Sequence, residues 1–335
     1  MKRLTPARLA AAGLLLLAVV ALVLWLAPSD SYIFLPDRAH PVAPLVRVAG
    51  GKPPRDGGGI YYVDVFVRKA SWLERLFPSI REGATIVPSS AVQAPGVSEK
   101  AQRTEDLRAM SRSQEIAAAV ALRALGYKVV AQSTGVLIED VARDAPAAGK
   151  LFPTDVILSV DSRRVRTAKE LRAILGSRPV GTTFRIVVRR GSGLTKVSVK
   201  TIADPSQAGR PILGIFAGQA ASVRLPVNVR IDAGDVGGPS AGLAFALDIL
   251  EQLGRDVDHG HRVAATGEIE LDGTVGPIGG VEQKTIGVRR AGIHVFLVPA
   301  GENAAEARRY AHGLRIVPVK TFQQALRALA TLPSD

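Results

Sequence analysis

The sequence of 335 residues contains no cysteine. Disulfide bonds, thiolate metal sites and a cysteine nucleophile are therefore excluded. It also lacks a GxxxxGK[ST] phosphate loop, because Lys52 and Lys150 follow glycine but are succeeded by Pro53 and Leu151. We therefore expect no ATP-driven step from this chain.

Histidine is scarce, with five residues in the chain. No two of them have the spacing of metal ligands on one helix, so we expect no metal site and no cofactor. Acidic residues are outnumbered, and the formal net charge is +13 with a pI near 10.4. The basic residues form scattered pairs, such as Arg163-Arg164 and Arg289-Arg290, without interleaved aromatic residues. We interpret most of this charge as solvated surface and expect no nucleic-acid partner.

One long uncharged run is present near the amino terminus. Three basic residues precede the 18 residues from Leu9 to Leu26. As a helix this run measures about 27 Å at about 1.5 Å per residue, close to the thickness of a bilayer core. By the positive-inside rule we expect residues 1–30 to be a single-pass membrane anchor with the catalytic part extracytoplasmic. A cleaved signal peptide is disfavoured, since Trp25 breaks the small-x-small pattern before Ala27.

The rest of the sequence alternates short strands and helices, which predicts a mixed α/β (α+β) fold. At 47% hydrophobic residues, and with about 150 residues per domain as the usual prior, it is long enough for about two domains with real cores. The hydropathy pattern and the positions of glycine and proline predict where the strands and helices begin and end. We expect strands at Ile60–Val67 and within 221–234, helices over 98–125 and Pro239–Leu253, and a strand pair around Asp272-Gly273.

A third group of elements lies between these helices. It comprises strands at Val136–Val141, Asp155–Val160 and Thr183–Arg189 and a helix at Ala168–Leu175. Their order and lengths resemble a bacterial PDZ domain, which we place at residues 126–203. The resemblance implies that an extended peptide is captured as an added strand, while loop N–H groups hold its terminal carboxylate. The residues Leu125, Gly126 and Tyr127 match the hydrophobic-Gly-hydrophobic form of that loop, although a helix C-cap explains Gly126 equally well.

A candidate nucleophile stands in the stretch GDVGGPSAGLAFALDIL. Pro239 at the first helical position places the Ser240 hydroxyl at a helix N-terminus, where unpaired N–H groups suit an oxyanion. The glycines Gly237 and Gly238 let a carbonyl group approach the backbone closely. The alternative is that Ser240 only caps the helix.

A candidate base stands 44 residues later, in PIGGVEQKTIGVRRAG. Lys284 follows a Gly-Gly turn, early on an amphipathic helix with apolar neighbours such as Ile286 and Val288. Apolar surroundings lower the pKa of a lysine amine towards neutrality, so that the free amine can act as a base. A Ser-Lys dyad needs no histidine.

Three motifs carry a family resemblance. They are GGPSAG around Ser240, TGEIELDGTVGPIGGVEQK ending at Lys284, and RRAGIHVFLVPAGEN after it. They resemble the proteolytic domain of Lon proteases, and with the anchor and the PDZ-like unit the chain is similar to bacterial PDZ-containing Lon-like membrane proteins. The resemblance implies Ser240 as nucleophile, Lys284 as general base, Thr266 as a partner of the lysine amine, and a homo-oligomer. The chain departs from the Lon pattern at Gly237, where an acidic residue is common.

The resemblance also implies a divided protease domain. Residues 36–125 would form its first part and residues 205–335 its catalytic part, with the PDZ-like unit inserted between them. We therefore expect a membrane-anchored, ATP-independent serine endopeptidase that cleaves unfolded, membrane or exported proteins or peptides. Two alternatives stay open: a catalytically silent PDZ scaffold at the membrane, and a Ser-His-Asp hydrolase that uses His261 or His294.

Overall fold

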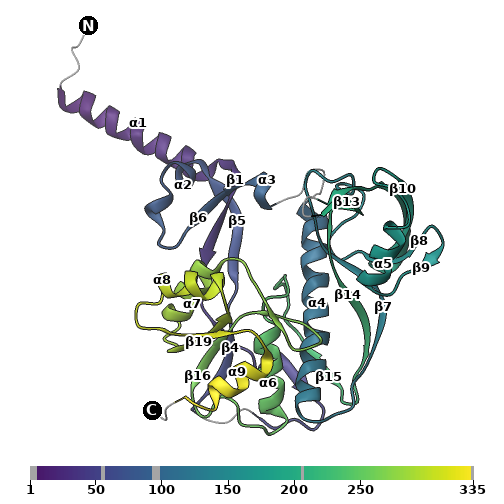
Figure 1. Ribbon diagram of the computed structural model, residues 1–335. Coiled ribbons are helices and arrows are strands. Elements are labelled where there is room, and N and C mark those ends of the chain that lie inside the picture. The colour runs from purple at the N-terminus through teal and green to yellow at the C-terminus, as the bar shows by residue number, and fades with distance from the viewer. Residues whose placement is uncertain (1–5, 54–56, 93–98, 205–206, 333–335) are drawn as a thin grey trace.

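A five-stranded sheet forms the centre of the molecule in the computed structural model, which describes residues 6–53, 57–92, 99–204 and 207–332 (Figure 1). The strand order is β2-β4-β16-β19-β20. Four strands run parallel, and β2 pairs antiparallel with β4 at one edge. The strands are β2 (His40–Pro41), β4 (Gly59–Tyr62), β16 (Arg262–Ala265), β19 (Val295–Pro299) and β20 (Arg315–Val319).

Helices cover both faces of this sheet, so its parallel strands are buried. Successive side chains of a strand point to opposite faces; Val263 and Ala265 pack in one core and Ala264 in the other. The first core is shared with α4, α6 and α9, and the second with α7 and α8. The bounds are α4 (Glu99–Ala124), α6 (Gly242–Gln252), α7 (Val281–Arg290), α8 (Glu302–Arg309) and α9 (Phe322–Leu329).

The helices α4 and α6 lie against each other at the point where α6 begins. A Cβ atom on Gly242 would stand 2.6 Å from Ser113 Oγ and 2.9 Å from Ile269 Cγ2, so only glycine allows this approach. The Ser113 hydroxyl donates a hydrogen bond of 2.8 Å to the carbonyl oxygen of Pro239. The turn before α6 is therefore held by a residue of α4.

A smaller sheet, ordered β5-β1-β6, extends from the central body towards α1 (Figure 1). The strand predicted over Ile60–Val67 is divided, because the chain bends at Val63 and Asp64 and passes from β4 in the large sheet to β5 in the small one. The elements here are α1 (Pro6–Leu26), β1 (Pro28–Pro36), β5 (Val65–Ser71), α2 (Trp72–Leu76), the 3-10 turn η1 (Pro78–Ile80), β6 (Thr85–Pro88) and α3 (Ser89–Val92).

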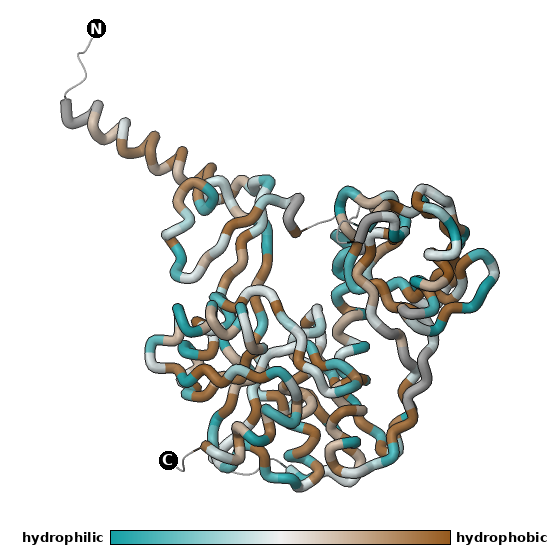
Figure 2. Tube along the Cα trace, in the orientation of Figure 1, coloured by the Kyte–Doolittle hydropathy of each residue, from teal (hydrophilic) through white to brown (hydrophobic). Residues whose placement is uncertain are grey.

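The helix α1 is apolar along most of its length, as its brown colour in Figure 2 shows. Its leucines 14 to 17 are all at least 65% exposed. Within the part of the chain that the structure describes, no helix combines the length and the apolar character needed to cross a bilayer. Lys2 and Arg3, which contributed to the predicted orientation, lie outside the described residues.

The elements predicted for the PDZ-like unit are present, and they form a separate sheet with its own core. The predicted helix Ala168–Leu175 is α5, and the strand order is β11-β10-β8-β7-β14, with β9 paired to β8. The first predicted strand begins six residues earlier than expected. The bounds are β7 (Val130–Val141), β8 (Val156–Val160), β9 (Arg163–Arg164), β10 (Thr183–Arg190), β11 (Gly193–Lys200) and β14 (Ile215–Arg224), with the pair β12 (Ile202–Asp204) and β13 (Gln207–Ile212) beside them.

Two short strand pairs complete the fold. The strand β3 (Val46–Val48) pairs with β15 (Val229–Ile231), and β17 (Glu268–Ile269) pairs with β18 (Val275–Gly276) around the predicted turn. The strand predicted within 221–234 is interrupted between β14 and β15, because Pro226 has no N–H group to donate to a sheet.

Candidate active site

The sequence predicted that Ser240 lies in the first turn of a helix that begins at Pro239. In the structure Ser240 instead lies in the turn before α6. The helix begins at Gly242, with Ala241 as its N-cap residue. The carbonyl oxygen of Ser240 accepts a hydrogen bond of 2.8 Å from the Gly267 N–H and one of 3.2 Å from Thr266 Oγ1. These two bonds join the turn to the segment after β16, while the Ser240 side chain stays partly exposed.

Lys284 lies in the first turn of α7, on the other face of the central sheet from α6, and its side chain extends to Ser240. Its Nζ atom is 2.9 Å from Ser240 Oγ and 3.5 Å from Thr266 Oγ1. The lysine is 4% exposed. The two residues that the sequence analysis paired are therefore within hydrogen-bonding distance, and Thr266 stands beside both of them.

The position of Lys284 is set by the start of α7. Gly280, the N-cap residue, has a φ of 68° in the left-handed region that favours glycine. A Cβ atom there would also stand 2.7 Å from Val65 Cγ2. Within the same helical turn Gln283 Nε2 donates hydrogen bonds of 2.9 Å to the Gly83 carbonyl oxygen and to Thr85 Oγ1. The helix that carries the lysine is thus bonded to the small sheet.

Burial lowers the pKa of Lys284 to about 8, and the negative charge of Asp64 acts in the opposite direction. An exposed lysine has a pKa near 10.4. A substantial fraction of the amine is therefore neutral slightly above physiological pH, and a neutral amine can accept a proton from the serine hydroxyl.

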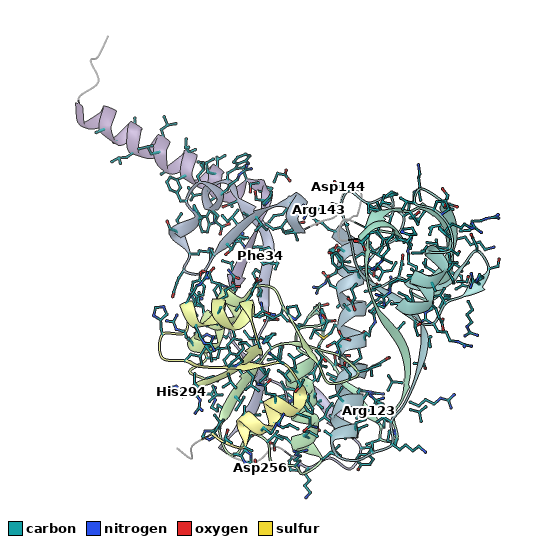
Figure 3. All side chains as sticks on the ribbon, viewed as in Figure 1. Phe34, Arg123, Arg143, Asp144, Asp256 and His294 are labelled. Carbon is teal, nitrogen blue, oxygen red and sulfur yellow. The ribbon has the colours of Figure 1, made fainter. Side chains whose placement is uncertain are left out.

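The two side chains open into a cavity of about 950 Å³. One wall comes from the small sheet, where Phe34 of β1 and residues 65–67 of β5 line it. Figure 3 labels Phe34 between the small sheet and the body below it. The other walls are the glycine-rich loop 235–240 and the turn 277–280 before α7. No histidine is among the described residues that line this cavity.

The family described as "Lon protease (S16) C-terminal proteolytic domain" matches residues 220–331, and the PDZ domain family matches residues 123–201. The comparisons support a serine peptidase. Ser240 and Lys284 both lie within the Lon-like match.

Among curated proteins, Lon protease 1 of Sorangium cellulosum is 37% identical over 145 residues, which cover 38% of this chain and 17% of that protein. Lon protease 2 of Bacillus subtilis is 27% identical over 198 residues, covering 59% of this chain and 33% of that protein. The chain thus spans no more than about a third of the length of these relatives. A solved structure, the PDZ domain of the SdrC-like protein of Listeria monocytogenes, is 29% identical, covers 25% of this chain and 87% of that chain, and has a TM-score of 0.24.

The glycine-rich loop of the Lon-like domain packs tightly against α4. A Cβ atom on Gly237 would stand 2.8 Å from the Cβ atom of Asp106, which explains why this chain has glycine where the Lon pattern commonly has an acidic residue. The Gly238 N–H donates to the Asp106 carbonyl oxygen at 2.9 Å, so this amide is not available to an oxyanion. Within the described residues the amides of Ser240 and Ala241 have no hydrogen-bond partner.

Asp64, which the sequence analysis did not single out, lines the same cavity as Ser240 and Lys284. Its Oδ1 atom is buried and has no hydrogen-bond partner among the described residues. Burial, followed by the charge of Asp37, raises the pKa of Asp64. The sequence does not mark Asp64 as a site residue, because it occupies one position of a run predicted to be a continuous strand. In the structure it stands at the bend between β4 and β5.

Among the described residues, two sets of side chains have oxygen or nitrogen atoms close enough to hold a cation, within 4.8 Å of one another. One is Asp37, His40 and Asp64, at the edge of the cavity, and the other is Glu251, Asp256 and Asp258. Neither set can be recognised in the sequence, because their members come from loops and strand ends that only the fold brings together.

The alternative histidine bases lie elsewhere. Figure 3 shows His294 at the outer edge of the lower body, away from Phe34. His294 lines a second cavity of about 450 Å³ together with His312. His261 is 8% exposed and follows the loop that contains Asp258. The geometry therefore favours Lys284 as the partner of Ser240.

The peptide-binding loop predicted in the PDZ-like unit is the end of a helix. Gly126 has a φ of 84°, and its N–H donates to the Arg123 carbonyl oxygen, while the Tyr127 N–H donates to the Leu122 carbonyl oxygen. This is the helix C-cap arrangement. Leu125 is partly buried and packs against the main core.

A second hydrophobic-Gly-hydrophobic sequence leads into the edge strand of the PDZ-like sheet. Leu213, Gly214 and Ile215 stand where β14 begins, and β14 pairs with β7 on one side only within the described residues. The helix α5 lies close to β14 and β13. In the sequence, this second candidate for the peptide-binding loop could have been found by its position directly before a run of β-branched and apolar residues.

Proposed function

We propose that the protein is a serine endopeptidase in which Ser240 is the nucleophile and Lys284 the general base. The observation that carries the proposal is the distance of 2.9 Å between Lys284 Nζ and Ser240 Oγ at the wall of an open cavity. The lowered pKa of Lys284 gives the amine the protonation state that a base requires.

The reaction would proceed through an acyl-enzyme. Neutral Lys284 takes the proton of Ser240 as Oγ attacks the carbonyl carbon of a peptide bond. The tetrahedral intermediate expels the amine, and Lys284 gives this amine the proton that it took from Ser240. A water molecule, deprotonated by the same lysine amine, then hydrolyses the ester and releases Ser240.

The oxyanion of the intermediate needs hydrogen-bond donors next to Oγ. We assign this role to the N–H groups of Ser240 and Ala241, which lie in front of the positive end of the α6 dipole and have no partner in the described residues. Gly237 supports the loop by allowing α4 to approach, and Gly238 supports it by adopting a φ of 83° in the left-handed region that favours glycine.

The substrates would be polypeptides that are already unfolded. The absence of a phosphate loop from the sequence supports an ATP-independent enzyme. We propose that residues 126–203, together with the edge strand β14, hold a peptide end by strand addition, with the N–H groups at Gly214 and Ile215 near its carboxylate. The separate sheet and core of this unit support an insertion after residue 125 that divides the protease domain. Because β14 belongs to this sheet and Leu213 to this core, the insertion would extend to Arg224, beyond the predicted boundary between residues 203 and 205, and the catalytic part would resume after it.

We also propose that α1 attaches the protein to the membrane with the catalytic part outside the cytoplasm. The support is the uncharged run Leu9–Leu26, preceded by basic residues, and the exposure of the leucines of α1. A homo-oligomer remains an expectation from the Lon resemblance.

Labelling with a fluorescent phosphonate that reacts with activated serines tests the chemistry. Wild type should be labelled and should cleave an unfolded casein substrate, while Ser240→Ala and Lys284→Ala should lose both properties. His261→Ala and His294→Ala are the matched controls and should keep them. Equal labelling of wild type and Ser240→Ala would contradict the proposal, and an unlabelled but correctly folded wild type would favour the silent scaffold.

A further inference from the structure

The segment Trp72–Ile80, made of α2 and η1, exposes a row of large apolar side chains. Trp72, Leu76, Phe77 and Ile80 are 41%, 56%, 55% and 52% exposed. Single exposed apolar residues are common on soluble proteins, but a contiguous group of this kind marks a surface that meets another molecule or phase.

This segment lies against the end of α1 (Figure 1). The Trp72 N–H donates a hydrogen bond of 3.1 Å to the Ala27 carbonyl oxygen. The Arg81 guanidinium lies 5.6 Å from the centre of the Trp25 ring. The apolar surface of the segment is therefore continuous with the exposed apolar side chains of α1, which end at Leu26.

The charged residues of the segment are placed so that it can face a negatively charged surface: its acidic residue is buried and its arginine is exposed. Its one acidic residue, Glu74, is 2% exposed and accepts hydrogen bonds from Arg68, Arg81 and the Ser71 N–H. These partners, Arg68 first, lower the pKa of Glu74 to about 2. The exposed residues of the segment are then the apolar ones, Ser79 and Arg75, and the Arg75 guanidinium stands 5.1 Å from the Trp72 ring centre.

We propose that Trp72–Ile80 binds the interfacial layer of a bilayer that contains anionic lipids. Tryptophan and phenylalanine side chains favour the boundary between headgroups and acyl chains, and arginine favours the phosphates. The inference rests on the proposed attachment of α1 to the membrane and adds a second point of contact. A second copy of this chain is the competing occupant, but continuity with α1 and the inward-turned Glu74 favour lipid.

Two contacts would fix the orientation of the protease relative to the membrane. The strand β5 connects the segment to the active site, since Val65 lines the cavity and Ser71 directly precedes α2. Its strand residues span roughly 20 Å at about 3.3 Å each. The length of β5 therefore sets an upper limit of about 20 Å on the distance from the Ser240 cavity to the bilayer surface, which keeps the cavity within reach of polypeptide that has left the membrane.

The chain has only two tryptophans, Trp25 and Trp72, so fluorescence can test the two contacts separately. The full chain is reconstituted into phosphatidylcholine and phosphatidylglycerol vesicles with or without bromine on the upper acyl-chain carbons. In Trp25→Phe, bromine should lower the Trp72 emission at least twofold. Adding Leu76→Ser and Phe77→Ser should halve this quenching, while Leu194→Ser, at an exposed leucine on β11, should leave it unchanged.

The variant Trp72→Phe reports on α1 alone. Quenching of Trp25 without quenching of Trp72 overturns the inference and leaves the attachment of α1 standing. If neither tryptophan is quenched, both proposals fall. A shift of the Trp72 emission that depends on protein concentration and not on bromine identifies a second copy as the occupant and also overturns the inference. Cleavage of a soluble peptide by Trp25→Phe tests the catalytic proposal independently.

Discussion

Lys284 Nζ lies 2.9 Å from Ser240 Oγ, although 44 positions separate the two residues in the chain. The serine stands in the turn before α6 and the lysine in the first turn of α7, on different faces of the central sheet. Thr266, just after the end of β16, bridges them, because its hydroxyl contacts the Ser240 carbonyl oxygen and lies 3.5 Å from Nζ.

Replacement of Lys284 should separate catalysis from stability. We expect Lys284→Met to abolish peptide cleavage and to raise the free energy of unfolding at pH 7 by up to about 3 kcal/mol, since a pKa lowered from 10.5 to about 8 is a cost of burying the charged amine. The unfolded state binds more protons between pH 8 and 10.5, so wild type gains stability as pH rises through this window. Urea unfolding of both proteins at about pH 7 and about pH 10 measures the difference, which should shrink to below about 1 kcal/mol at the higher pH. A gain that is the same at both pH values would mean that the charge of Lys284 is not its cause.

The pH dependence of cleavage should report the environment of Lys284. In wild type, kcat/KM should rise with pH until about pH 8, where the amine becomes neutral. Asp64→Asn removes the negative charge that raises the pKa of Lys284, so the acidic limb should move to lower pH. Asp235→Asn is the control, because its carboxylate lines the same cavity but its side chain is 99% exposed. An unmoved limb in Asp64→Asn would show that the two groups are not coupled.

Thr266 should contribute to positioning more than to stability. Thr266→Val removes the hydrogen bond to the Ser240 carbonyl oxygen and the contact with Lys284, so we expect kcat to fall about 10-fold to 100-fold with little change in KM. The unfolding free energy should fall by about 1 kcal/mol. Thr285→Val is the matched control, since Thr285 is also buried and its hydroxyl bonds the Val281 carbonyl oxygen on α7. If both variants lose activity equally, Thr266 has no special place in the site, whereas rescue by Thr266→Ser would support its hydroxyl.

Restoring the acidic residue of the Lon pattern at position 237 should be harmful in this chain. A Cβ atom at this position would stand 2.8 Å from the Cβ atom of Asp106, and overpacking of this kind costs about 1–3 kcal/mol. Gly237→Asp should therefore lower both the midpoint of thermal unfolding and the cleavage rate. Gly193→Ala, whose added Cβ would meet its nearest neighbour at 3.8 Å, should change the unfolding free energy by less than about 0.5 kcal/mol. Full activity of Gly237→Asp would indicate that α4 moves freely away from the serine loop.

Much of the secondary structure followed from local patterns. The helix α5 has the predicted bounds Ala168–Leu175, because a threonine cap precedes it and Gly176 follows it. The predicted strand over Ile60–Val67 was wrong at its centre, since nothing local distinguishes a bend at Val63 and Asp64 from a continuous β-branched run. At Gly126 the sequence left two interpretations open, because a glycine that ends a helix and a glycine that opens a binding loop look alike in sequence; the structure shows the helix C-cap.

The sequence alone determined the kinds of chemical group at the site: a serine after two glycines and a proline, and a lysine among apolar neighbours, with no thiol and no phosphate loop. Only the tertiary structure decided which carboxylate faces the lysine and which amides remain unpaired. Those facts depend on contacts between distant segments, such as the Gly238 amide with Asp106 on α4 and Asp64 at the cavity of Lys284. Hydrogen bonding and burial are properties of packed neighbours, and segments far apart in the chain become neighbours only when it folds.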